Sequence, residues 1–234
     1  SPPARVRFGS DTRDEMGELL VQVLPRRAAD APALRAEVAR KNLLTDIAGE
    51  EKRVADVPDD ARTRNALGVA YIQAGRVQEA LVQIEASLQT NPNLAMGHYN
   101  LGVIAMGRDQ ADEAIRHFAT AIALEPDYAE AHNNLGIVLE SRGRTRDAEV
   151  HYRAALTSRP ANAAARNNLG RVLLARGAVA DALAEFRQAL RSRPDDGDVL
   201  YNLGRALVAN RQPRDAVVQW RRALVARPDS VVFA

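Results

Sequence analysis

Proline recurs every 34 residues through most of this chain, and this spacing restricts the possible folds more than any other feature. A leucine–glycine pair and an alanine follow the same period, so several independent positions mark one unit. Self-similarity at a period of about 20–50 residues is typical of repeat architectures, in which each unit stacks on the next. The prolines are Pro92, Pro126, Pro160, Pro194 and Pro228, and the paired glycines are Gly68, Gly102, Gly136, Gly170 and Gly204.

The bulk composition agrees with stacked helices and narrows the function. Apolar residues make up 46% of the 234 residues but aromatic residues only 4%, so the core must consist mostly of aliphatic side chains. The net charge is +2 and no basic block dominates, so nucleic acid is not indicated as a partner. The absence of cysteine excludes disulfides and thiolate metal sites, and no apolar run approaches the roughly 18 residues of a membrane span.

Each unit of 34 residues contains two helical patterns joined by a short turn. In the third unit the spacing predicts one helix over 129–142 and a second over 146–158. Gly143 ends the first helix because glycine reaches the left-handed conformation at low cost. Pro160 follows the second helix because proline cannot extend it.

The small residues of the unit have a packing reason. Without a side chain at Gly136 a neighbouring helix can approach closely, and Ala148 has the same effect on the second helix. Three positions depart from the pattern, since Asp109 and Arg211 replace the glycine of the turn and Ala105 replaces a larger residue. A bulky residue four positions after the alanine fills the space: Ile84, Phe118, Tyr152, Phe186 and Trp220.

These positions together resemble the tetratricopeptide repeat family over residues 61–230. The resemblance implies an all-α fold, a right-handed superhelical solenoid in which the first helix of each repeat faces a concave groove. It also implies a non-catalytic scaffold that binds an extended peptide or protein segment, without a cofactor. The five repeats are expected at 61–94, 95–128, 129–162, 163–196 and 197–230.

Both flanks of the array are expected to differ from the repeats. Residues 27–60 are predicted to form a helix that caps the first repeat, because apolar residues recur there at helical spacing. The tail 231–234 is apolar and leaves the last repeat without a complete further helix, so self-association through the C-terminal repeat is a second possible function. The recurring apolar residues near the N-terminus are Leu34, Val38, Leu43, Leu44, Ile47 and Val54.

Residues 1–26 do not follow the repeat and are expected to be an extended leader, or the tail of a domain upstream of Ser1. The stretch 7–17 resembles the last motif of the copper type II, ascorbate-dependent monooxygenases, in which a methionine ligates copper. Met16 matches that methionine, but Gly17 replaces the family's cysteine and the His-x-His ligands are absent. This resemblance implies an accessory or assembly domain of a larger enzyme, no complete metal site here, and an extracytoplasmic rather than a cytoplasmic location.

A row of asparagines is the main candidate for a binding surface. Side-chain amides offer a donor and an acceptor together, which matches the groups of a peptide backbone. The alternative is that each amide bonds a neighbouring helix, and the two roles are compatible. Four asparagines stand one residue before the leucine of successive repeats and two precede them directly: Asn100, Asn134, Asn168 and Asn202, with Asn133 and Asn167.

Three residues after the asparagine row, a second row changes from apolar to basic along the array. Two arginines on adjacent helices suit a carboxylate or phosphate, because guanidinium forms bidentate pairs. An extended segment with an apolar stretch and an acidic residue or free C-terminus would fit such a groove. The alternative is an ion pair within the array, for example with Glu140. The row consists of Val69, Val103, Ile137, Arg171 and Arg205.

The four histidines occupy two pairs of equivalent positions in adjacent repeats. Ligand spacing such as His-x3-His is absent, and no nucleophile with an orienting acid accompanies them. They are therefore expected to serve packing or to lie on the surface, and no metal site is predicted. The pairs are His98 with His132, and His117 with His151.

Overall fold

The structure, a computed structural model, describes residues 31–226, with side chains from residue 35 onward, and these residues form eleven helices and no strand. α2 (Ala31–Asp56) precedes five helix pairs. The expected leader 1–26 with Met16, and the tail 231–234, lie outside the described residues. The first helices of the pairs are α3 (Ala61–Gln73), α5 (Ala95–Gly107), α7 (Ala129–Ser141), α9 (Ala163–Ala175) and α11 (Gly197–Ala209). The second helices are α4 (Val77–Thr90), α6 (Ala111–Leu124), α8 (Thr145–Ser158), α10 (Val179–Ser192) and α12 (Pro213–Ala226).

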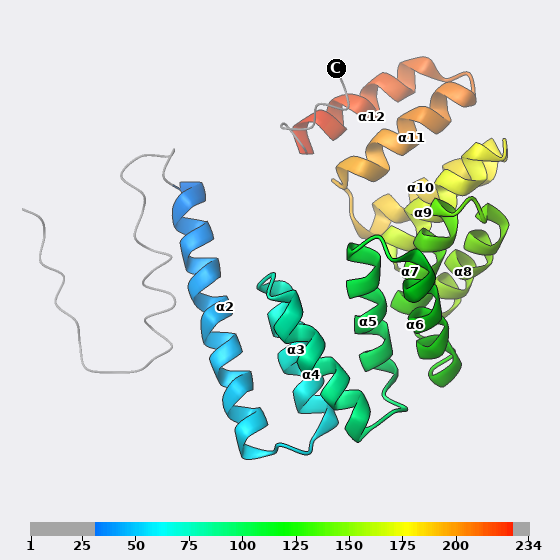
Figure 1. Cartoon of the computed structure of the whole chain (residues 1–234). Helices are drawn as coiled ribbons and strands as arrows, with labels where there is room; N and C mark the ends of the chain where they lie inside the picture. The colour runs from blue at the N-terminus through cyan, green and yellow to red at the C-terminus, as the bar shows by residue number, and fades with distance from the viewer. Residues whose placement is uncertain (1–30, 227–234) are drawn as a thin grey trace, which may run out of the picture.

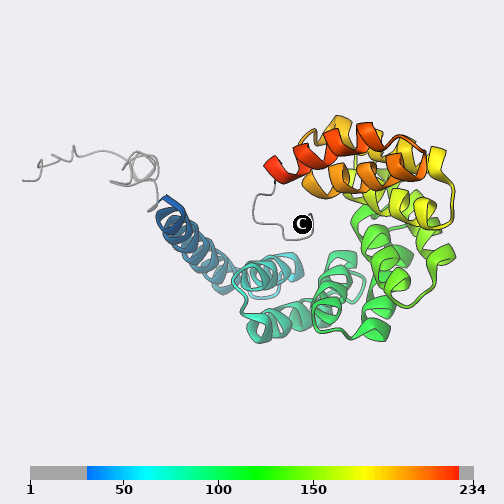
Figure 2. The ribbon, with the colours of Figure 1, turned by 90° about the horizontal axis from the view of Figure 1, so that it is seen from above.

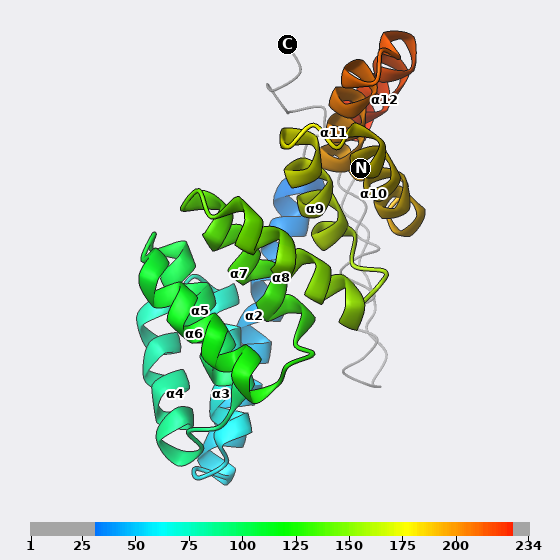
Figure 3. The same cartoon turned by 90° about the vertical axis from the view of Figure 1, so that its right-hand side faces the viewer.

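The predicted all-α solenoid of helix pairs is confirmed. In the third repeat, α7 and α8 begin and end within one residue of the predicted helices. The pairs follow one another along the array from α3 and α4 to α11 and α12, as Figures 1 and 3 show. Each second helix packs against the first helix of the next repeat, so the repeats share one extended stack.

The stack is strongly curved, and in projection it follows an open ring (Figure 2). The first helices of successive repeats contact one another directly, α3 with α5, α5 with α7, α7 with α9 and α9 with α11. They therefore line the inner side of the curve. Side chains that point away from the second helices form one continuous surface along this inner side.

The conserved spacing of glycine and bulky residue closes each helix pair. A Cβ atom added to Gly136 on α7 would lie 2.6 Å from a ring carbon of Tyr152 on α8, closer than real Cβ contacts. Tyr152 is fully buried, and Ala148 one turn before it is buried as well. The same glycine positions in the other four repeats meet Ile84, Phe118, Phe186 and Trp220.

The turns within the repeats keep one backbone conformation whether or not glycine is present. Gly143 has a φ of +75°, in the left-handed region that glycine enters without steric cost. Asp109 and Arg211, which replace this glycine in two repeats, both have a φ of +60°. The fold therefore forces these two side chains into a conformation that costs roughly 1–2 kcal/mol in other residues.

α2 continues the repeat pattern beyond the first pair. Pro58 stands 34 residues before Pro92, so the proline period includes the residue that follows α2. Ile47 is buried against α3, and Val54 packs beside it in the same cluster. α2 thus covers the first repeat in the way that each second helix covers the next repeat.

The core consists of two clusters of buried side chains that meet on α5. The N-terminal cluster includes Ile47, Tyr71, Ile84 and Ile104. The C-terminal cluster begins at the neighbouring Ala105 and extends to α12. Ala105 occupies a position where other repeats have Tyr71 or a leucine, so α5 offers little bulk at this boundary.

Candidate functional site

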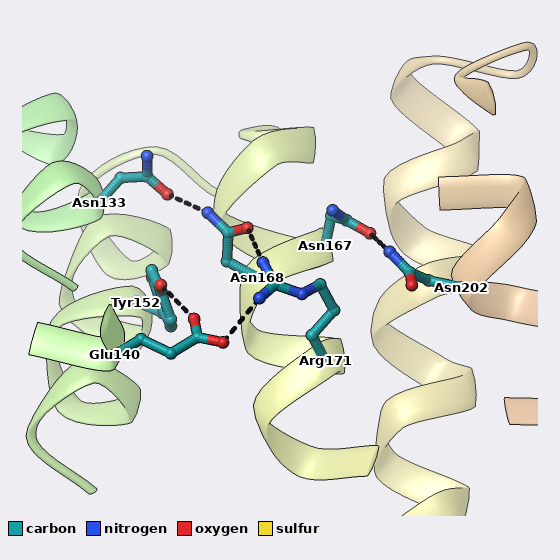
Figure 4. A network of polar contacts seen from close by, with 7 residues as sticks. All are labelled: Asn133, Glu140, Tyr152, Asn167, Asn168, Arg171 and Asn202. Carbon is teal, nitrogen blue, oxygen red and sulfur yellow. Dashed lines mark hydrogen bonds and ion pairs between the residues drawn. The ribbon is translucent and has the colours of Figure 1, made fainter. Parts of the chain in front are cut away.

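Amide pairs join the first helices of adjacent repeats. Nδ2 of Asn168 on α9 donates to Oδ1 of Asn133 on α7 over 3.1 Å, and Figure 4 shows this pair in place. Asn202 donates to Asn167 over 3.0 Å in the same way. At the other end of the array Asn100 donates to Asn65 over 3.0 Å.

One repeat varies this arrangement. Tyr99 replaces asparagine on α5, and Nδ2 of Asn134 donates to its hydroxyl oxygen over 3.2 Å. Asn133 in turn donates to Oδ1 of Asn134 over 3.2 Å. The second role that the sequence suggested, a bond to a neighbouring helix, therefore holds along the whole row.

Burial divides the predicted amides into two groups. Asn100, Asn133, Asn168 and Asn202 are buried, so their amides are hardly accessible from the inner side. Asn134 and Asn167 are partly exposed. Contact of the amide row with a peptide stays a prediction, and these two residues are the ones that a peptide could reach.

Arg171 takes part in a network within the array (Figure 4). Its Nη2 lies 2.7 Å from Oε1 of Glu140 on α7, and its Nη1 donates to Oδ1 of Asn168 over 3.3 Å. Oε2 of Glu140 accepts a hydrogen bond from the hydroxyl of Tyr152 over 2.8 Å. Burial, together with this carboxylate, raises the pKa of Tyr152, so its hydroxyl remains a donor. The ion pair with Glu140 that was the alternative for Arg171 is present.

Arg205 differs from its equivalent one repeat earlier. Its side chain is exposed and forms no hydrogen bond or ion pair with other residues among 31–226. Val103 and Val69 in the same row are partly exposed, and Ile137 is exposed to 37%. The row thus runs from aliphatic side chains on α3, α5 and α7, through a neutralised arginine on α9, to a free cation on α11.

A further row of apolar side chains extends this surface and was missed from the sequence. Met106 and Leu174 are partly exposed, and Val208 is exposed to 46%. These residues stand three positions after members of the predicted row. Residues three apart lie on the same helix face, so this spacing was the signal that could have found them.

The histidines form two pairs that link the helices within a repeat. Nδ1 of His98 lies 3.4 Å from Nδ1 of His117, and the equivalent distance between His132 and His151 is 3.0 Å. Burial, and then the facing imidazole, lowers the pKa of His117 and of His151. No group of three or more His, Cys, Asp or Glu side chains within 31–226 could hold a metal ion.

The same position carries a different pair in the fourth repeat. Arg166 donates to the carbonyl oxygen of Pro160 over 3.0 Å and lies 2.6 Å from Glu185. Nε2 of His132 faces the carbonyl oxygen of Pro126 at 3.1 Å, in the place of the arginine. The histidine pairs are therefore variants of a recurring link between the inter-repeat turn and the two helices.

Membrane insertion and copper binding receive no contribution from the described helices. None of the helices in 31–226 combines the length and the apolar character needed to cross a membrane. The stretch 7–17, which resembles the copper monooxygenase motif, lies outside these residues together with Met16.

Comparison with known proteins agrees with the helix-pair architecture. A family model of the tetratricopeptide repeat matches residues 31–95 and 139–197, and two more models of this repeat match 93–161 and 173–232. No curated protein matches the sequence.

Several solved structures are similar to the chain, all at identities that show the fold alone. YrrB, "a TPR protein with an unusual peptide-binding site", has a TM-score of 0.62 at 20% identity, over 79% of this chain and 95% of its own. PilW, a "widely conserved type IV pilus biogenesis factor", has a TM-score of 0.66 at 22% identity, over 73% and 79%. MamA from Desulfovibrio magneticus RS-1 has a TM-score of 0.63 at 19% identity, over 74% and 98%.

Proposed function

Because this chain belongs to the tetratricopeptide repeat family, we propose that it is a non-catalytic scaffold that binds an extended segment of a partner protein. The segment lies along the first helices on the inner side of the curve. The observation that carries the proposal is the row on these helices that changes from aliphatic residues to the unpaired Arg205.

Apolar side chains supply the first part of the interaction. Val103 and Met106 on α5 are partly exposed, and Ile137 on α7 is exposed to 37%. Covering such surface is favourable by roughly 25 cal/mol per Å² of apolar area. A partner segment with aliphatic side chains is therefore expected over α5 and α7.

Arg205 sets the polarity of the ligand. Glu140 already neutralises Arg171, whereas Arg205 has no partner among residues 31–226. A guanidinium group forms a two-pronged contact with a carboxylate. The acidic residue or free C-terminus of the partner is therefore expected at α11, with the apolar stretch extending toward α5.

Backbone recognition falls to the accessible amides. Asn134 and Asn167 are partly exposed, and their buried neighbours hold them in place through the amide pairs. A hydrogen bond of this kind contributes about 0.5–1.5 kcal/mol net. Two such contacts align a segment but do not bind it alone, so affinity depends on the apolar row and on Arg205.

The similar structures lend support by analogy. YrrB carries a peptide-binding site by the words of its structure's title, and PilW is a pilus biogenesis factor. A shared fold does not transfer a partner, so the chemistry of the row, and not the likeness, defines the expected ligand.

A peptide selection tests the proposal. Random dodecapeptides with a free C-terminus would be selected on the immobilised chain, and the affinities of the selected peptides would be measured by calorimetry. We expect apolar peptides that carry a carboxylate, and Arg205→Gln should weaken them about ten-fold, as expected for a lost charge-assisted contact.

Arg187→Gln is the matched control, since Arg187 is an exposed arginine on the second helix α10. It should leave the affinity unchanged. Equal affinities of the wild type and the Arg205→Gln variant for every selected peptide would refute the groove assignment.

Self-association is a second candidate, and one observation on α12 favours it. Val217 is exposed to 43%, whereas its equivalent Leu183 on α10 is exposed to only 4% because α11 covers it. Leu224 on the same helix is exposed to 42%. If copies associate through α12, Leu224→Glu should abolish a concentration-dependent rise in sedimentation coefficient, while Val150→Glu on α8 should not.

A further inference from the structure

Two adjoining hollows lie at the turns before α7 and α9. Their volumes are about 640 Å³ and about 340 Å³, and both are lined by Tyr99, Glu130 and Arg159. The larger hollow is also lined by Met96 and Tyr128. No member of the row that ends in Arg205 lines either hollow, so they form a separate part of the inner surface.

The larger hollow has an aromatic wall. The ring centroids of Tyr99 and Tyr128 are 5.0 Å apart, and Tyr99 also packs on Phe118 at 5.8 Å. The bond from Asn134 fixes the hydroxyl of Tyr99, so the ring has a defined orientation. Met96 is exposed to 49% beside this wall. Aromatic faces and a thioether form a surface suited to a flat or cationic group.

Tyr128 occupies a position where other repeats place a helix cap. Asp60, Asn162 and Asp196 accept hydrogen bonds from backbone N–H groups in the first turns of α3, α9 and α11. Tyr128 makes no such bond at α7, and the remaining equivalent, Leu94, is buried. A local rule that a repeat breaks without structural compensation points to a functional position.

Two carboxylates at the hollow are unpaired. Glu130 forms an ion pair with Arg159, whereas the side chains of Glu125 and Asp127 make no hydrogen bond or ion pair with other residues among 31–226. Burial, with Tyr99 and the carboxylates of Glu130 and Glu125 nearby, raises the pKa of Tyr128 to about 12. The hollow therefore combines neutral aromatic faces with an excess of negative charge.

We propose that this hollow binds an arginine side chain of the partner segment. The guanidinium stacks on Tyr128 and pairs with Glu125 or Asp127, while Met96 contacts the aliphatic stem. Arginine fits better than lysine because its planar group stacks on aromatic rings and presents a fork of donors to carboxylates. The inference deepens the proposed function, since it assigns a second, oppositely charged contact of the same segment.

A small probe tests this site independently of any partner. N-acetyl-L-arginine methylamide would be titrated into the whole chain while NMR follows the ring signals of Tyr99 and Tyr128. We expect a saturable shift of both rings that weakens with salt, and no such shift with N-acetyl-L-norleucine methylamide. Tyr128→Asn, which copies the capping residue Asn162, should weaken the arginine probe about ten-fold and leave the fold intact.

Charge removal gives a second variant that does not alter the packing of the wall. Glu125→Gln with Asp127→Asn should weaken the arginine probe to a similar extent, whereas Arg205→Gln should leave it unchanged. Equal shifts by the arginine and norleucine probes, or unaltered affinity in both variants, would overturn the inference. The peptide affinities of Arg205→Gln test the proposed function separately, so either failure can be recognised without the other.

Discussion

Nδ1 of His132 on α7 lies 3.0 Å from Nδ1 of His151 on α8, and the same contact joins His98 to His117 one repeat earlier. The carbonyl oxygen of Pro126 can only accept, so Nε2 of His132 must carry a hydrogen. In the neutral ring its Nδ1 is then the acceptor for the N–H of His151. Two fully protonated rings would place N–H groups opposite each other and break the contact.

We expect the folded state to lose stability as the pH falls below 6.5. The pKa values of His117 and His151 are lowered from 6.5 by burial and by the facing imidazole, so the unfolded chain binds protons first. Stability from this source is present above pH 6.5 and is lost below it. Thermal unfolding measured between about pH 8 and about pH 5 checks the direction.

The fourth repeat supplies the control for this pH dependence. His132→Arg with His151→Glu copies the link that Arg166 and Glu185 make. This variant should keep the link at acidic pH, so its melting temperature should fall less than that of the wild type. Identical slopes against pH in the two proteins would contradict a role for the histidine pair.

Gly136→Ala should destabilise the array by about 1–3 kcal/mol, because a Cβ there would overlap the ring of Tyr152. Gly49→Ala on α2 is the matched control, since nothing lies within 4 Å of the added Cβ. That exchange should stabilise the helix by up to about 1 kcal/mol. Urea unfolding of both variants measures the difference, and a loss of stability at Gly49 would count against the packing explanation.

Asn168→Ala removes the donor to Asn133 and leaves a buried carbonyl oxygen without its partner. Unpaired buried groups cost about 1–3 kcal/mol, so the free energy of unfolding should fall by that amount. Asn93→Ala, at an exposed asparagine of an inter-repeat turn, should change it by less than about 0.5 kcal/mol. If the two variants unfold alike in denaturant, the amide pairs do not stabilise the stack.

Asp109→Gly and Arg211→Gly should each stabilise the protein, by about 0.5–1 kcal/mol, because glycine adopts a positive φ without steric cost. Gly143→Ala makes the opposite change at an equivalent turn and should destabilise it. Melting temperatures of the three variants test the sign. A lower melting temperature for Asp109→Gly would show that its side chain contributes a contact that outweighs the backbone strain.

The repeating part of the fold was predictable because its signals are local. Proline, glycine and the bulky residue at 34-residue spacing define the helix pairs and the contact between Gly136 and Tyr152. The row that ends in Arg205 could be written down from spacing alone. Pro58 also obeys the period, a signal that the repeat assignment from residue 61 onward left unused.

The rest of the candidate site depends on distances between repeats, which spacing does not give. The sequence left two roles open for the amides, and only coordinates show that Asn168 reaches Asn133. The pairing of Arg171 with Glu140, and the freedom of Arg205, depend on side-chain positions in neighbouring helices. The aromatic wall at Tyr128 is a break in the period, and a search for regularity does not register such a break.

The division of the core at Ile104 and Ala105 has a mechanical consequence. The two clusters touch through neighbouring residues of one helix, so the array can flex at α5 while each cluster keeps its own contacts. The radius of the ring is then an elastic variable, and a segment bound across the seam would hold it at one value. Recognition by this chain would be read out as a change of shape between its two ends.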